Sequence, residues 1–144
     1  MPVETTLEEL AESFELLDDW MDRYKTILDL GGELDPMDEA LKVDAHKVKG
    51  CMSQVWLVGT LGSEGRMHFL ADSDAHLVKG LIAIVLMLYG DKTPAEILET
   101  EHAAALAELG LDKHLSPGRS NGLHSMIKRI RALAEAHLAR GPSA

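Results

Sequence analysis

The sequence of 144 residues contains a single cysteine, Cys51, and few aromatic side chains, which make up 4% of the chain. One cysteine cannot form an intramolecular disulfide, so the fold cannot depend on a disulfide framework. One thiolate is also fewer than the several cysteine ligands that an iron–sulfur cluster normally takes. This cysteine content is compatible with a reducing compartment, and we expect a cytoplasmic protein.

The chain also lacks a long apolar run and a recognisable export signal. The longest apolar stretch is LIAIVLMLY at residues 81–89, whereas a membrane-spanning helix needs about 20 residues. The first ten residues, MPVETTLEEL, carry acidic groups where a secretory signal carries basic and apolar residues. We therefore expect neither membrane insertion nor export, and a single domain over residues 1–144.

Basic residues are scarce: 14 Lys and Arg stand against 24 Asp and Glu, which gives a formal net charge of −10. The excess lies in residues 1–47, with 14 acidic and 4 basic residues, whereas residues 117–144 have 1 acidic and 5 basic residues. This balance disfavours binding to a phosphate backbone, so we predict no nucleic-acid partner. The chain contains no GxxxxGK or GxGxxG stretch, so a nucleotide-binding or pyridoxal-binding protein is poorly supported.

The first third of the chain has helical spacing. TLEE at residues 6–9 is a capping box that starts one helix, and Asp18 or Asp19 caps a second. The glycine pair at residues 31–32 is expected to end that helix in the left-handed conformation. Residues 33–45 show no clean period and predict a loop with at most one short helical turn.

The middle of the chain predicts a β-hairpin followed by a buried helix. Residues 54–61 are rich in β-branched and aromatic side chains, residues 62–65 (GSEG) signal a turn, and residues 66–71 alternate as a second strand. Residues 46–50 could add a short first strand. Residues 72–90 are apolar on nearly every side of a helix, which predicts a central buried helix.

Two further helix starts follow. TPAE at residues 93–96 is a capping box with proline at the first helical position. Ser116 and Pro117 begin a long amphipathic helix, whose apolar face is Leu123, Met126, Ile127, Ile130, Leu133 and Leu138. Together these elements predict an α+β fold: a compact domain with an antiparallel sheet of two or three strands packed against the central helix and flanking helices.

Cys51 follows Gly50 and precedes the first predicted strand. A glycine permits an unusual backbone angle, so a turn here would project the thiol from the start of the strand. The residues alone leave a nucleophilic thiol and an inert, buried cysteine both open. The cations that could favour the thiolate are His46, Lys47 and Lys49.

Two other chemistries also remain open for this thiol. A Cys–His hydrolase would use His46, His68 or His76 as the base, but no oxyanion-hole glycine motif accompanies them. A mixed tetrahedral metal or iron–sulfur site is the other alternative, although no CxxC or HxxxH spacing supports it. Its ligands would be Cys51, His46, His68 and either Asp72 or Asp74.

Four stretches in consistent order and spacing resemble the SufE/CsdE family of sulfur acceptors for cysteine desulfurases. They are VKGCMSQVWL, MHFLADSDAHLVKGLIAIVL, KTPAEIL and LGLDKHLSPGRSNGL. The resemblance runs from about Phe14 to the final helix. It implies an α+β fold shared with the scaffold proteins of iron–sulfur assembly but without their cluster-ligating cysteines, and it implies no bound cofactor or metal.

The resemblance also implies a function for Cys51. This cysteine would accept a sulfane sulfur from the persulfide of a cysteine desulfurase that uses pyridoxal phosphate, and the chain would stimulate that enzyme. The sulfur would then pass to a cluster scaffold or another thiol acceptor, with no stand-alone catalysis. Such an exchange requires one reactive cysteine, and a second one nearby could discharge the persulfide as a disulfide.

Further positions are implied by the same resemblance. Gly50 would shape the loop, and His46 stands where many family members have asparagine. Asp74 and Arg119 match recurrent positions that could shape the partner surface, but they are also interpretable as a helix cap and an exposed helix start. The complete set of loop and partner-binding positions is His46, Gly50, Ser53, Gln54, Asp74 and Arg119.

Overall fold

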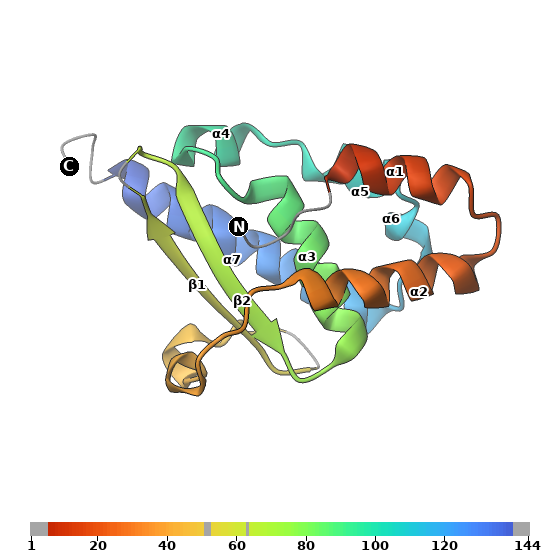
Figure 1. Cartoon of the computed structure of the whole chain (residues 1–144). Coiled ribbons are helices and arrows are strands. Elements are labelled where there is room, and N and C mark those ends of the chain that lie inside the picture. The colour runs from red at the N-terminus through yellow and green to blue at the C-terminus, as the bar shows by residue number, and fades with distance from the viewer. Residues whose placement is uncertain (1–5, 51–52, 63, 140–144) are drawn as a thin grey trace.

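The structure is a computed structural model of the whole chain, and it describes residues 6–50, 53–62 and 64–139 (Figure 1). The elements in chain order, with η for a short 3-10 helix, are α1 (Leu7–Glu15), α2 (Trp20–Leu30), η1 (Gly31–Glu33), η2 (Glu39–Leu41), η3 (Asp44–His46), β1 (Val55–Leu61), β2 (Met67–Ser73), α3 (His76–Tyr89), α4 (Pro94–Glu99), α5 (His102–Glu108), α6 (Leu111–His114) and α7 (Pro117–Ala139).

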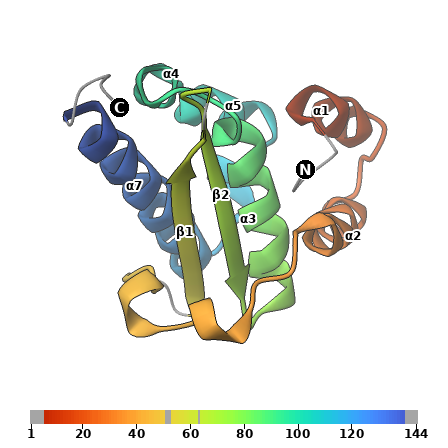
Figure 2. The same ribbon diagram turned by 60° about the vertical axis from the view of Figure 1, so that its left-hand side comes forward.

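The two strands form an antiparallel hairpin that lies across α3 and α7. Val55 pairs with Ser73 at one end, and Leu61 pairs with Met67 at the other. Figure 2 shows both strands in front of the two helices, with α7 behind β1 and α3 behind β2. Alternate residues of β2 are buried, as expected for a strand with one face on a core. The predicted α+β class and hairpin are confirmed, with two strands.

The predicted starts of the first two helices are also confirmed. The Thr6 hydroxyl accepts the Glu9 N–H at 3.1 Å, and the Glu9 carboxylate accepts the Thr6 N–H at 3.0 Å, which completes the capping box. The Asp19 carboxylate accepts the Met21 N–H at 2.9 Å and caps α2. Local side-chain chemistry was sufficient to predict both starts.

The left-handed ending predicted for α2 is wrong. Gly31 has a φ of −59°, and the chain continues into η1. A Cβ on Gly31 would lie 2.9 Å from the Cβ of Lys79 on α3. This glycine is therefore explained by close packing between segments that are distant in sequence, which the local pattern cannot reveal.

The segment before β1 is more structured than predicted. It forms two short helical turns, η2 and η3, where the sequence predicted at most one. The short first strand expected over residues 46–50 is reduced to a single antiparallel bridge between Lys47 and Trp56.

The central helix is buried as predicted, but it begins later than the pattern indicated. α3 starts at His76, because residues 72 and 73 belong to β2. The capping box of α4 and the start of α7 at Pro117 are confirmed. Two short helices, α5 and α6, were not predicted, and Leu138 of the expected apolar face is 50% exposed. Among the helices of the described ranges, none combines the length and apolar character of a membrane span.

Candidate functional site

The loop that carries Cys51 is closed at its base by backbone pairing. The Val48 N–H donates to the Val55 carbonyl at 2.8 Å, and the neighbouring Lys47 and Trp56 form the isolated bridge. Val48 and Val55 are both buried, which holds the two ends of the loop against the core. Cys51 itself lies outside the residues that the structure describes.

The exit of the loop is fixed to the junction between β2 and α3. The Ser73 hydroxyl donates to the Gln54 carbonyl at 2.7 Å, and the Asp74 carboxylate accepts the Gln54 N–H at 3.0 Å. The same Ser73 hydroxyl accepts the Ala75 N–H at 3.2 Å. Asp74 is therefore not the cap of α3, whose N-cap position is Ala75. It fixes the backbone three residues beyond Cys51.

Gly50 adopts the left-handed conformation, with a φ of +90°. Its backbone also passes so close to α7 that an added Cβ would lie 2.6 Å from the Ser125 hydroxyl oxygen. Both observations favour glycine at this position, because it is the residue that combines this angle with this approach at no steric cost.

Replacing Gly50 by alanine is expected to lower the free energy of unfolding by about 1 kcal/mol from backbone strain, with an added cost from the contact with Ser125. Urea denaturation measures the loss, and the rate of thiol labelling at Cys51 reports on the loop. Gly65→Ala is the matched control, because Gly65 has a φ of +78° and open space around it. Gly50→Ala is expected to lower the free energy of unfolding more than Gly65→Ala does. Adding Ser125→Ala to Gly50→Ala should remove that difference, because the contacting hydroxyl is then absent. Equal losses in all variants would contradict the packing argument.

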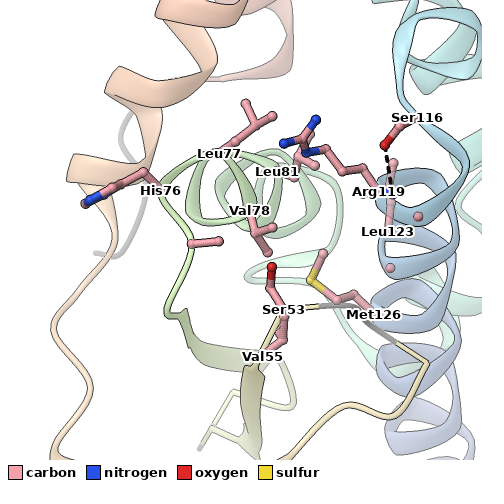
Figure 3. Close-up of a pocket in the computed structure, with 13 residues that line it drawn as sticks. Ser53, Val55, His76, Leu77, Val78, Leu81, Ser116, Arg119, Leu123 and Met126 are labelled. Carbon is pink, nitrogen blue, oxygen red and sulfur yellow. Dashed lines mark hydrogen bonds between the residues drawn. The ribbon is translucent and has the colours of Figure 1, made fainter.

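A pocket of about 410 Å³ lies beside the loop, between α3 and the first turns of α7 (Figure 3). Ser53 and Arg119, both implied by the family resemblance, line it together. Figure 3 shows the Arg119 side chain reaching towards Leu77 and Leu81 on α3. The remaining described lining residues are Val55, Ala75, His76, Val78, Ser116, Gly118, Gly122, Leu123 and Met126.

Arg119 lies where α7 begins. Its backbone N–H donates to the Ser116 hydroxyl at 3.4 Å, and the residue is exposed. A guanidinium group beside an apolar pocket can meet an acidic group on a partner while aliphatic surface is buried beneath it. The structure thus brings Ser53 and Arg119 to one pocket, although they are far apart in the sequence.

The histidines do not gather at this loop. The His46 ring Nδ1 bonds to the Leu41 carbonyl at 2.7 Å within its own segment. His68 pairs with Thr60 near the hairpin turn, whereas Asp74 follows the opposite end of β2. A strand rises about 3.3 Å per residue, so these two candidate metal ligands are separated by roughly 20 Å. Within the described ranges, no three His, Cys, Asp or Glu side chains are close enough to hold a metal ion.

A charge cluster that the sequence did not predict fixes the segment before the loop. The Asp72 carboxylate pairs with Lys42 at 3.1 Å and with Lys79 at 3.5 Å, and the Lys42 ammonium lies 5.7 Å from the Trp56 ring centre. Burial raises the pKa of Asp72, but the Ser73 N–H and the two lysines outweigh it and hold the pKa of this carboxyl below its ordinary value. The alternation of β2 could have revealed the inward position of Ser73, whereas the lysine partners depend on the tertiary fold.

Replacing Asp72 by asparagine is expected to reduce the acid sensitivity of the fold. Because the folded-state pKa lies below the unfolded value, the carboxylate stabilises the fold above about pH 4, and this contribution is lost as the pH falls through the folded pKa. Asp72→Asn should therefore be less stable than wild type at pH 7 and lose less stability below about pH 4. Urea denaturation at both pH values measures this, with the exposed Asp29→Asn as control. Parallel pH profiles for all three proteins would refute the prediction.

A family model, SufE, described as an Fe-S metabolism associated domain, matches residues 8–134. The chain belongs to the SufE family. An uncharacterized SufE-like protein of Rhizobium meliloti (strain 1021) is 41% identical over 137 residues, which cover 93% of this chain and 98% of the relative. A second uncharacterized SufE-like protein, from Rhizobium etli, is 42% identical and covers 93% of both chains.

The fold of this chain is also found among solved structures. The solution structure of a hypothetical protein from Thermus thermophilus matches with a TM-score of 0.73 over 96% of this chain and 99% of that one. The sequence identity is 18%, so this likeness shows the fold alone. Family membership places the chain in Fe–S metabolism.

Proposed function

We propose that this SufE-family protein is a sulfur acceptor and relay. It takes sulfur onto Cys51 from the persulfide of a pyridoxal-phosphate cysteine desulfurase and passes it to a cluster scaffold or another thiol. The observation that supports this most is the setting of the only cysteine, in a loop fixed at both ends beside an apolar pocket. A reducing cytoplasm suits a chain with one reactive thiol.

The transfer step needs no other catalytic group. The Cys51 thiolate attacks the outer sulfur of the protonated donor persulfide, and the sulfur–sulfur bond of the donor breaks as a new one forms on Cys51. The donor cysteine leaves as a thiolate, and the transferred sulfur keeps its proton. Delivery to the next acceptor repeats the exchange in the opposite sense, with Cys51 as the leaving thiolate.

The fixed ends of the loop limit how far the thiol can travel. Cys51 lies three residues from both Val48 and Gln54, so its Cα stays within about 10 Å of either anchor. The donor cysteine must therefore come close to the domain surface. Ser53, which lines the pocket, is two residues from Cys51, so the pocket is within reach of the transferred sulfur. A sulfur held there would be shielded from reductants and oxidants.

We further propose that the partner contacts the edge of this pocket. Arg119 lines it, Asp74 directly precedes the lining residue Ala75, and both Arg119 and Asp74 are exposed. Asp74 also fixes Gln54, so a partner that engages its carboxylate would alter the exit of the loop. Such coupling offers a route by which docking changes the loop that carries Cys51 and by which the acceptor stimulates the desulfurase.

Intact-mass analysis tests the proposal. Wild-type protein incubated with a cysteine desulfurase and cysteine should gain the mass of one sulfur, and peptide mapping should place it on Cys51. Treatment with a thiol reductant should remove it, because a persulfide is reducible. A protein that gains no sulfur, or gains it on a peptide without Cys51, would disprove the relay.

A further inference from the structure

A second hollow lies beside the segment that leads into Cys51 and is lined by cations. It has a volume of about 340 Å³. We call this hollow the basic groove, and its described lining residues are Val48, Lys49, Ser125, Lys128, Arg129 and Ala132. The four lining residues on α7 recur at spacings of three and four, so they form one continuous face of that helix.

The cations of the basic groove have no acidic partner among the described residues. The ion pairs of those ranges involve Lys42, Arg66 and Lys79, and none involves Lys49, Lys128 or Arg129. Arg129 donates a hydrogen bond to the neutral Ala45 carbonyl at 3.1 Å, and no carboxylate in the described ranges pairs with its positive charge.

These unpaired charges are unusual in a chain with ten more acidic than basic residues. Elsewhere in the described chain lysines do find carboxylates: Lys42 by itself pairs with two, Glu39 and Asp72. The basic groove instead concentrates positive charge, and none of its described lining residues is acidic. Such a surface favours a ligand that brings its own negative charge.

The position of the basic groove connects it to the loop. Ser125 lines the groove and is also the residue that a Cβ on Gly50 would contact at 2.6 Å. Lys49 is the residue before that glycine. A ligand seated in the groove therefore contacts the backbone that leads into Cys51.

We propose that the basic groove binds an acidic polypeptide segment of the protein that donates sulfur to Cys51. This inference rests on the proposed function for the identity of the partner. Carboxylates of the donor would pair with Lys49, Lys128 and Arg129, while the short apolar floor of Val48 and Ala132 would accept their aliphatic stems. Binding here would orient the donor cysteine towards the loop and oppose the repulsion that the net charge of −10 imposes on an acidic partner.

The experiment compares two double variants with the same change in net charge. Lys49→Gln/Lys128→Gln removes two cations of the basic groove. Lys25→Gln/Lys113→Gln removes two exposed lysines from α2 and α6, which have no side-chain partner among the described residues. One assay measures binding of a fluorescent peptide of alternating glutamate and glycine, and the other titrates a cysteine desulfurase against the rate of sulfur uptake.

The Lys49→Gln/Lys128→Gln variant (the groove double variant) should bind the peptide at least about fivefold more weakly than wild type in low salt. The Lys25→Gln/Lys113→Gln variant (the control double variant) should stay within about twofold of wild type. The half-saturating desulfurase concentration should rise by a similar factor, and the difference should shrink at high salt. If wild-type protein gains sulfur, a groove double variant that behaves like the control double variant in either assay overturns the proposal. If wild-type protein gains no sulfur, the proposed function is rejected instead, and the peptide assay alone tests whether the groove binds acidic polypeptide.

Discussion

Replacing Cys51 by serine is expected to abolish sulfur uptake by this chain, with a loss of at least roughly 100-fold in the rate of transfer. The serine oxygen is not ionised at neutral pH and forms no stable bond to sulfane sulfur, whereas a thiolate does both. Stimulation of the desulfurase should fall with it, because the donor persulfide then has no acceptor. The measurement is the intact mass of the variant after incubation with a desulfurase and cysteine.

A second variant separates the thiol from its position. Cys51→Ser/Ser13→Cys keeps one cysteine in the chain but places it on the exposed side of α1. If the loop and its pocket matter, this protein should remain as inactive as Cys51→Ser although its thiol is freely labelled. Sulfur uptake at the wild-type rate by the relocated thiol would contradict the proposal that the loop and its pocket are required for transfer. Urea denaturation of both variants checks that the fold is retained.

Replacing Gly80 by alanine is expected to destabilise the fold by about 3 kcal/mol or more. An added Cβ would lie 2.0 Å from the Ile27 carbonyl oxygen and 2.7 Å from its carbonyl carbon. Because these are backbone atoms, no rotamer change relieves the overlap, and α2 must move away from α3. Overpacking of a core costs about 1–3 kcal/mol even where side chains can adjust. Small domains are stable by about 5–15 kcal/mol, so the loss is a large share of the total.

Gly32→Ala is the matched control for this prediction. Gly32 has no atom within 4 Å of its would-be Cβ and does not adopt a positive φ. Its substitution should leave the urea midpoint within about 0.5 kcal/mol of wild type. A second variant, Gly80→Ala/Ile27→Val, should remain destabilised, because the clash with the Ile27 carbonyl persists. A normal midpoint for Gly80→Ala would mean that the α2–α3 contact is looser than the structure shows.

Patterns that depend on neighbouring residues predicted much of the fold. The caps at Thr6, Asp19 and Thr93 act over three residues or fewer, so the sequence alone places those helix starts. The hairpin and the buried α3 follow from apolar periodicity. The short helices α5 and α6 were not predicted, because their few turns show too little periodicity and gain their stability from packing.

For the site as well, the sequence identified residues, whereas the tertiary fold determined their contacts. Cys51, Gly50, Ser53 and Arg119 were selected from sequence motifs, and the structure places Ser53 and Arg119 on one pocket and gives Gly50 a positive φ. The sequence left Asp74 open as a helix cap or a partner-binding position, and the structure shows that its carboxylate accepts the Gln54 N–H across the β2–α3 junction. Sequence spacing could not predict that pairing, because the two residues are brought together by the register of the hairpin.

The sequence by itself determined an α+β fold and a single thiol directly after Gly50, because composition, caps and periodicity act locally. The tertiary structure alone decided what surrounds the segments on either side of that thiol: Ser73 and Asp74 beside Gln54, the pocket that Ser53 and Arg119 line, and the cations of α7 beside Lys49. These groups come from segments far apart along the chain. Only the packing of α3 and α7 against one face of the hairpin fixes the distances between them.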